Sequence, residues 1–305
     1  MFSSMLLVHK MYEIVSLVKR NIKMYLRDPL AVFFSFLSTI ILLAIYILFL
    51  GNVGGEQLAS LLSPKETDFL VYSQMMAGVI VLNTLTIPLG NLGNIVTDYE
   101  EGKVAAFMVT PVKRYKIIVG YYLSSLLITI TLSLIFWVVA VLVLGLVTGI
   151  FFPVSLILLI VPIIILFAII STSFMILLTT FIKSINAFGA VSGIFGSMIG
   201  FIAGIYIPIS SSTPNFLRNL SSLIPFSHMT IFLKQILMEP ALNIILSKEG
   251  GSIEVVNGVK DGFGANELGI LGLDVNLGVI IAVSVLLSAL LIALSSYRLN
   301  KRFKA

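Results

Sequence analysis

The stretch that decides the fold is residues 117–182, IIVGYYLSSLLITITLSLIFWVVAVLVLGLVTGIFFPVSLILLIVPIIILFAIISTSFMILLTTFI. It contains no Asp, Glu, Lys, Arg or His. An α-helix needs about 20 apolar residues, at about 1.5 Å of rise each, to cross a hydrocarbon core of about 30 Å. The stretch is therefore long enough for two crossings, and the glycine and proline of TGIFFP at 148–153 divide it. We predict transmembrane helices at 117–147 and 155–182.

The same lack of charge recurs along the rest of the chain. Four more charge-free stretches each have room for one crossing, at 30–50, 70–96, 187–208 and 276–297. The 305 residues are 58% apolar and 11% charged, with a mean hydropathy of +1.11, whereas a soluble domain is about 45–50% apolar and about 25% charged. This composition excludes a soluble globular enzyme. It predicts an all-α membrane protein in which residues 1–305 form a single domain with six transmembrane helices.

Basic residues gather on one side of this predicted topology. With the N-terminus inside, the inner segments carry 14 basic and 5 acidic residues, and the outer segments carry 5 basic and 9 acidic residues. Basic segments stay on the cytoplasmic side, and six crossings place both ends on one side. We therefore expect both termini in the cytoplasm and the chain in the plasma membrane. The net charge of +5 follows from this bias, so we expect no nucleic-acid partner.

Residues 11–28 precede the first predicted crossing and have two different faces. Ile14, Val18, Ile22, Tyr25 and Leu26 share one side, and basic residues lie on another. This pattern predicts an amphipathic helix that lies against membrane lipid in the inner interface. A simple anchor and a partner-binding helix are both open readings.

Residues 97–116, TDYEEGKVAAFMVTPVKRYK, begin with acidic residues and end in a basic cluster. Between them the sequence predicts a short apolar helix from Val104 to Val109, with an order of charges that suits the helix dipole. A helix of about two turns gains little stability alone. We expect it to pack against another surface, and an ordinary basic loop is the alternative.

Residues 209–274 form the largest outer segment. The apolar stretch Phe226–Met238 is too short to cross, and it predicts a re-entrant or interfacial helix pair between the fifth and sixth crossings. Further along, Asn257-Gly258 flanked by apolar residues gives a weak β-hairpin signal, with a mobile loop as the alternative.

Motifs for catalysis are missing from the sequence. The pattern GxxxxGK[ST] is absent, so the chain cannot cradle the phosphates of ATP as an ATPase does. His9 and His228 are far apart, and no clustered carboxylates or cysteines suggest a metal. We expect no catalytic residue, metal or cofactor in this chain. The predicted crossings also hold no charged residue or histidine, which disfavours a transporter built on a charged relay.

Uncharged polar residues and glycines mark two of the predicted crossings. The second crossing holds Asn83 and Asn94, which share a face, and neutral amides inside lipid need a partner helix or a wet cavity. The fifth crossing ends near Tyr206 and carries glycines at short intervals, at Gly189, Gly193, Gly196, Gly200 and Gly204. Small residues let helices approach closely, either inside one chain or between two.

The order of these parts resembles the membrane subunit of type 2 ATP-binding-cassette exporters. The strongest similarity runs from EEGK at 100–103 through TPVKR at 110–114 to Gly120, an acidic glycine turn, a short helix and a Thr-Pro-Val-basic ending. GIYIPI at 204–209 and KRN at 19–21 with RDP at 27–29 are also similar to the family. KVAA at 103–106 and the insertion 242–274 depart from its pattern.

The resemblance implies that the 97–116 segment is a coupling helix that docks on a separate ATPase subunit, which binds ATP and Mg. The implied contact residues are Asp98, Glu100, Glu101, Gly102, Lys103, Val104, Phe107, Met108, Pro111, Lys113 and Arg114. It also implies a second membrane subunit, either another copy or a homologue. The second and fifth crossings would then border the pathway, with Asn83, Thr86, Asn91, Asn94 and Tyr206 as candidate cargo contacts and the five glycines as helix packing or a dimer seam.

We therefore expect the transmembrane subunit of an ATP-driven exporter that moves an amphipathic or apolar cargo, such as a drug, lipid or peptide, out of the cell. One alternative is a secondary transporter or lipid scramblase that works alone. Another is a membrane immunity or scaffold protein that transports nothing.

Overall fold

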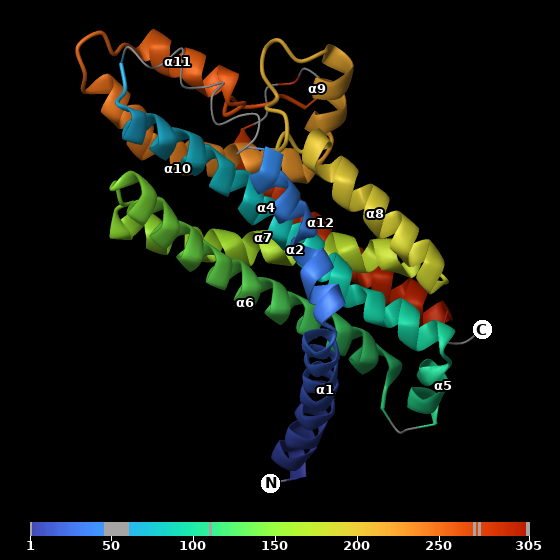
Figure 1. Ribbon diagram of the computed structural model, residues 1–305. Helices are drawn as coiled ribbons and strands as arrows, with labels where there is room; N and C mark the ends of the chain where they lie inside the picture. Colours follow the sequence, from blue (N-terminus) through green and yellow to red (C-terminus); the bar gives the residue numbers. More distant parts are fainter. Residues whose placement is uncertain (1, 46–60, 110–111, 271–272, 274–275, 303–305) are drawn as a thin grey trace.

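The computed structural model describes residues 2–45, 61–109, 112–270, 273 and 276–302. Within these residues the regular secondary structure is helical, apart from an isolated bridge between Ile270 and Leu273, and turns and irregular segments connect the helices (Figure 1). The helices are α1 (Phe2–Arg27), α2 (Pro29–Ile45), α4 (Pro64–Glu100), α5 (Lys103–Met108), α6 (Arg114–Thr148), α7 (Val154–Thr180), α8 (Ile185–Ile202), α9 (Asn215–Ser222), α10 (Pro225–Leu246), α11 (Ile253–Gly262) and α12 (Leu277–Arg302).

Six of the described helices are long and apolar enough to span a membrane: α4, α6, α7, α8, α10 and α12. Five of them coincide with predicted crossings. The first predicted crossing, 30–50, falls on α2, and its end lies outside the described residues. The sixth helix, α10, is longer than the apolar stretch that we recognised, because the helix continues through Pro240 to Leu246. The all-α membrane fold is confirmed, and the re-entrant course of this region stays a prediction.

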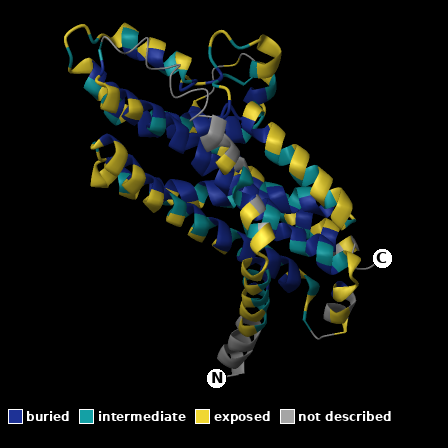
Figure 2. Cartoon of the chain, viewed as in Figure 1, coloured by how far each residue is buried: buried dark blue, intermediate teal, exposed yellow. Residues whose placement is uncertain are grey.

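Helix α4 is the centre of the bundle, and α8 lies at its edge. In the most apolar 18-residue window of α4, 94% of the residues are buried inside the chain, against 11% in the corresponding window of α8. Helices α2, α6, α7, α8 and α10 all pack against α4, which therefore appears dark in Figure 2. Much of the surface of α8 is left for lipid or another protein.

The turn between α6 and α7 lies where the sequence predicts, because α6 ends before Gly149 and α7 starts directly after Pro153. Helix α2 starts at Pro29. Gly149 has a φ of +75°, a left-handed conformation that glycine adopts without the steric cost of a Cβ.

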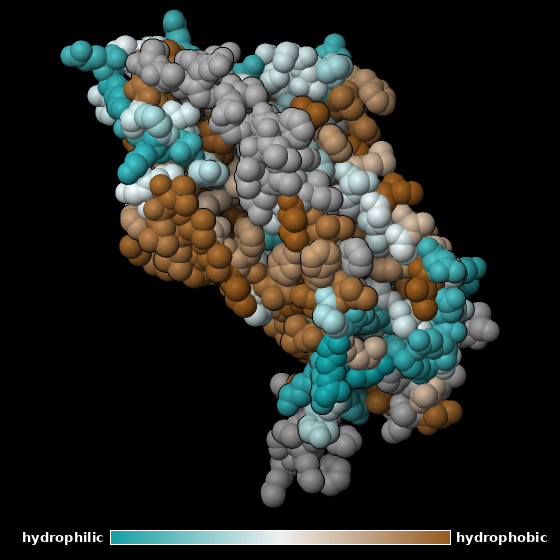
Figure 3. Space-filling model, in the orientation of Figure 1, coloured by the Kyte–Doolittle hydropathy of each residue, from teal (hydrophilic) through white to brown (hydrophobic). Residues whose placement is uncertain are grey.

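Polar residues gather at the two ends of the molecule. Helix α5 and the C-terminal end of α12 lie at one end, where α1 also projects, and α9 and α11 lie at the other (Figure 1). A broad apolar zone separates the hydrophilic residues of these ends (Figure 3). We refer to them as the α5 end and the α11 end.

The expectation for residues 253–262 was wrong. This stretch is helix α11, not a hairpin or an irregular loop. The Ser252 hydroxyl accepts a hydrogen bond from the Val255 amide and caps the helix. Val256 and Val259, one turn apart, are both buried. This helical spacing outweighs the turn signal of Asn257-Gly258.

Candidate functional site

The segment between α4 and α6 contains the short helix that the sequence predicts. Helix α4 ends at Glu100, Gly102 turns the chain with a φ of +73°, and α5 covers Lys103–Met108. Val104 is buried and belongs to the main hydrophobic core, whereas Val109 is 87% exposed. One apolar side chain thus anchors α5 to the bundle, and another faces outward.

A buried carboxylate lies at the base of this segment. Asp98 is 0% exposed. Its two oxygens accept hydrogen bonds from Nη1 and Nη2 of Arg20 on α1, at 2.8 Å each, and the Tyr121 hydroxyl of α6 also donates to it. A bidentate arginine–carboxylate pair is among the strongest polar contacts in proteins. Asp98 therefore joins α1, α4 and α6 at one point.

The charge of Arg20 is secured by the same contact. Burial alone would lower the pKa of Arg20, but the hydrogen bonds and the negative charge of Asp98 more than compensate and raise this pKa above its usual value. Arg20 also donates to Asn21 Oδ1 at 2.9 Å. The guanidinium is consequently held in one orientation toward α4.

A second ion pair joins α1 to α6 nearby. Lys116, near the start of α6, is 4% exposed and donates to the Glu13 carboxylate of α1. On the same helix pair, a Cβ added to Gly120 would lie 2.8 Å from Leu17 Cβ, so α1 and α6 are in close contact there. The apolar side predicted for 11–28 does face the bundle at Val18 and Tyr25, while Leu26 is exposed. The interfacial placement of this helix stays a prediction.

The other predicted ATPase contacts are mostly at the surface. Glu100 accepts a hydrogen bond from the Ile185 amide at the start of α8, and Glu101 pairs with Lys103. Gly102 and Lys113 are exposed, and Arg114 is half-buried. The side chains of Phe107 and Met108 are not described, and Pro111 lies outside the described residues. Asp98 differs from this group because it is enclosed by the chain itself.

The candidate cargo residues fall into two groups. Asn83 and Thr86 face α2, since Asn83 Oδ1 accepts from Thr39 Oγ1 at 2.7 Å and Thr86 Oγ1 donates to the Ser35 carbonyl at 2.7 Å. Asn91 and Asn94 are closer to the α5 end of α4. Among the described residues, the Nδ2 atoms of both have no hydrogen-bond partner although they are buried. An unpaired amide inside a bundle is available to water or to a polar group of a cargo.

The glycines in and directly after α8 differ in their surroundings. Gly189 and Gly193 are exposed, with open space where a Cβ would be. Gly200 is covered by the ring of Tyr206, which a Cβ would approach to 2.3 Å, and Gly204 ends the helix region with a φ of +67°. Tyr206 is therefore a packing residue of this chain in the described conformation, and the exposed glycines of α8 are the ones free to meet another helix.

Sequence reasoning missed the contacts that hold these elements. Arg20, Tyr121, Glu13 and Lys116 were not singled out as a group, because no local pattern in the sequence pairs residues of α1 with residues of α4 and α6. It also missed Gly78 and Gly93 of α4, where an added Cβ would lie 2.6 Å from Ile205 and from Phe188. These two glycines mark close approaches at the two ends of the α4–α8 contact.

Helix α10, which was not among the predicted crossings, holds a lysine and a histidine that are both buried. Lys234 is 1% exposed and donates to the Gly204 and Phe263 carbonyls at 2.9 Å each. His228 is also buried, with Nε2 at 2.9 Å from the Ser222 carbonyl. Both were assigned to an outer segment, because 226–238 was read as too short to cross. Among the described residues, no Asp or Glu forms a salt bridge with Lys234.

These features define a class of protein: an all-helical, multi-pass membrane protein with a short helix fixed at one end of its central helix. The chain matches the family model for the ABC-2 type transporter over residues 12–238. It therefore belongs to that family, the membrane subunits of type 2 ABC transporters. No curated protein matches the sequence.

Membership makes the chain a permease subunit of an ABC transporter. Such subunits are generally not catalytic themselves, and they pair with an ABC ATPase and often with a second permease. The family match ends at residue 238, so α11 and α12 and their connections lie beyond it.

Proposed function

We propose that this chain is the transmembrane subunit of an ATP-driven exporter, and that a separate ATPase subunit docks on residues 97–116 at the α5 end. ATP and Mg would bind in that partner. The α5 end, with both termini, would face the cytoplasm of a cell whose plasma membrane holds the chain. A second copy or a homologous permease would complete the transporter.

The observation that carries the proposal is the Asp98 contact. A force on α5 reaches α4 across the two-residue turn at Gly102, and the Arg20–Asp98–Tyr121 contacts connect this end of α4 to α1 and α6. The contact from Glu100 to the Ile185 amide extends the same connection to α8. Docking at α5 would therefore move several helices as one rigid unit, which is what a permease without its own nucleotide site requires.

The cargo class follows from the polarity of the helices. The described parts of α4, α7 and α8 present apolar side chains with a few neutral amides such as Asn91 and Asn94. A fully charged cargo would be desolvated there without compensation. An amphipathic or apolar cargo, such as a drug, lipid or peptide, needs no such compensation.

Docking can be tested with two matched substitutions. Val109→Asp changes an exposed apolar residue beside α5, and Phe216→Asp changes a residue that is 74% exposed on α9 at the α11 end. We expect Val109→Asp to lower co-purification of the ATPase subunit about tenfold, because one carboxylate enters an apolar contact at a cost of more than about 1.4 kcal/mol. Phe216→Asp should leave co-purification unchanged. Equal retention of the ATPase by both variants would reject docking at α5.

A further inference from the structure

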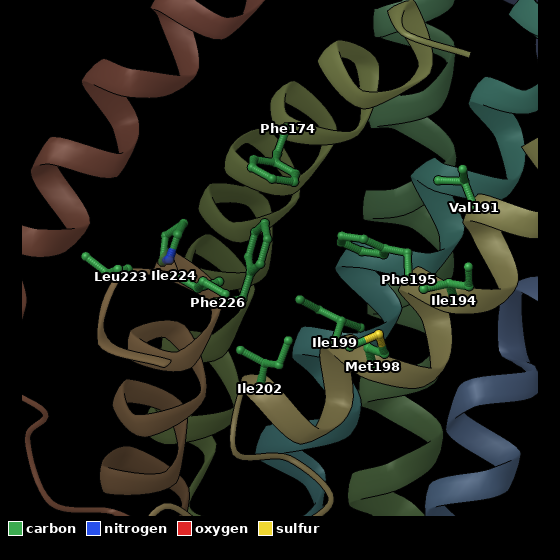
Figure 4. Close-up of a pocket in the computed structure, with 11 residues that line it drawn as sticks. Phe174, Val191, Ile194, Phe195, Met198, Ile199, Ile202, Leu223, Ile224 and Phe226 are labelled. Carbon is green, nitrogen blue, oxygen red and sulfur yellow. The ribbon is translucent and has the colours of Figure 1, made fainter. Parts of the chain in front are cut away.

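A lateral cavity of about 360 Å³ lies between α7, α8 and the segment that joins α9 to α10 (Figure 4). Its lining consists of aliphatic and aromatic residues, one proline and one methionine. Binding cavities for small molecules range over about 300–1,000 Å³, so this one has room for a single slender group. Nothing in its lining side chains donates or accepts a conventional hydrogen bond. The occupant must therefore be hydrocarbon where it is enclosed.

One wall of the cavity is rigid. The Phe174 ring meets Phe226 edge-on, with centroids 5.2 Å apart and an interplanar angle of 89°, and it lies 6.4 Å from the Phe195 ring. Phe226 is 0% exposed and belongs to the main core. The cavity is thus backed by fixed side chains of the bundle and is not a gap in a loose surface.

The opposite wall faces outward. Ile194 and Met198 of α8 line the cavity and are 60% and 53% exposed. Helices α7 and α8 are both long and apolar enough to span a membrane, and the exposed side of a spanning helix contacts either acyl chains or another helix. The cavity accordingly communicates with the surface that meets lipid or a partner.

The position of the exposed glycines on α8 favours an acyl chain over a second protein as the occupant of the cavity. At about 3.6 residues per turn, Gly189 and Gly193 lie on the side of α8 opposite to Val191 and Met198. Close helix packing uses small residues, so a second copy that packs on these glycines leaves the cavity uncovered. The end of the cavity lined by Leu223 and Ile224 directly follows α9, whose exposed polar residues can border a headgroup.

We infer that this cavity binds one acyl chain of a membrane phospholipid, with the headgroup beside α9. The chain fills the space between α7 and α8 and supports α8, the least buried of the six long apolar helices. This site is separate from the docking of an ATPase and does not require that the permease export its cargo outward.

The test uses the full chain in phosphatidylethanolamine–phosphatidylglycerol vesicles with a small fraction of phosphatidylcholine that carries a photoreactive diazirine at the end of one acyl chain. After illumination, mass spectrometry locates the labelled residues. We expect labelling at Val191–Ile202 to exceed that of equally exposed residues of α12 about tenfold, the effect of enclosing roughly two more methylene groups. Val191→Trp, which fills the cavity, should remove this excess. Leu286→Trp, at a residue of α12 that is 74% exposed, should leave it intact.

Three outcomes would overturn the inference. Labelling of α8 equal to that of α12 would show ordinary lipid contact only. An unchanged excess in Val191→Trp would place the lipid elsewhere, and Ile202→Trp provides a second cavity-filling variant should the first fail to fold. Efficient cross-linking of two chains through Ile194→Cys, with no excess of lipid labelling, would assign the cavity to a second copy. All of these measurements are made without ATP or an ATPase, so the docking proposal stands or falls separately.

Discussion

The two ends of the bundle stabilise a buried charge in different ways. At the α5 end, Asp98 is enclosed but faces the guanidinium of Arg20 and the hydroxyl of Tyr121. At the α11 end, Lys234 is enclosed, and its partners among the described residues are neutral carbonyls, those of Gly204 just after α8 and Phe263 just after α11. A helix C-terminus carries partial negative charge that favours a cation.

The difference indicates what each end is built to do. The Arg20–Asp98 pair joins two helices that are far apart in the sequence, and it holds them together only while both charges are present. A movement of one helix can be transmitted to the other through this pair. At the α11 end, the C-terminal ends of α8 and α11 both accept hydrogen bonds from Lys234 of α10, so these three helices are held in a fixed arrangement. We therefore expect the α5 end to be the more sensitive one when a single partner is removed.

The largest effect should follow from Arg20→Met. This change leaves the Asp98 carboxylate buried without its cation, which typically costs about 3–5 kcal/mol. The free energy of unfolding can be measured by titration with dodecyl sulfate, with the fluorescence of Trp137, the single tryptophan of the chain, as the probe. Lys23→Met, which removes an exposed charge from the same helix, is the control and should change the free energy of unfolding little.

A double variant sharpens this prediction. Adding Asp98→Asn to Arg20→Met removes the unpaired charge, so the double variant should be more stable than the Arg20→Met variant. If the two substitutions were simply additive, the contact at Asp98 would not be a charge pair in the folded protein.

A smaller loss is expected for Lys234→Met. The methionine keeps most of the apolar length of the side chain and removes a buried charge, but it leaves two carbonyls without their donor. We expect a loss of about 1–3 kcal/mol in the free energy of unfolding, measured by the same titration. A loss larger than that of Arg20→Met would reverse the ranking of the two ends.

Two glycines extend the comparison to the backbone. Gly102 at the α5 end and Gly149 at the far end of α6 have φ values of +73° and +75°, and a Cβ added to either would meet no atom of a neighbouring residue within 4 Å. Alanine at either position should cost about 1 kcal/mol, because a side chain disfavours this conformation. Only Gly102→Ala should also lower ATP hydrolysis by the assembled transporter. Equal effects on hydrolysis would remove the special role of the turn before α5.

The smallest expected effect is a loss of local stability at the α11 end when the pH is lowered. Asp261 accepts hydrogen bonds from the Ser211 hydroxyl and amide and from Asn266, and these contacts hold its pKa below the ordinary value of 3.8. Their contribution is complete above about pH 4 and is lost as the pH falls through the lower pKa of the folded state. Hydrogen exchange of residues 253–266 should therefore rise at low pH. In Asp261→Asn this rise should be absent.

The sequence predicts the helices of this fold well because their signals are local. Charge-free stretches locate the long helices except α10, and Gly149 and Pro153 correctly mark the end of α6 and the start of α7. The interpretation of α10 was limited to the apolar stretch that ends at Met238, whereas the helix continues through Pro240 to Leu246. In α11, the burial of Val256 and Val259 overrode a turn dipeptide.

The sequence predicts the short helix of the candidate site but not the contacts that connect it to the other helices. Residues 97–116 attract attention by their charge order and by resemblance, and the helix at 103–108 is confirmed. The partner of Asp98 lies 78 residues earlier in the chain, and no local pattern pairs two such positions. The burial of Lys234 depends in the same way on the return of the 263–265 segment to α10.

The central claim is that an ATPase subunit meets this chain at α5, and single-cysteine cross-linking tests it most directly. The chain has no cysteine of its own, so Val109→Cys and Phe216→Cys each introduce one reactive thiol. Co-purified transporter is treated with a short thiol–amine cross-linker, and linked peptides are identified by mass spectrometry. We predict links from Val109→Cys to the ATPase subunit and none from Phe216→Cys. Links to the ATPase from Phe216→Cys alone would contradict the account.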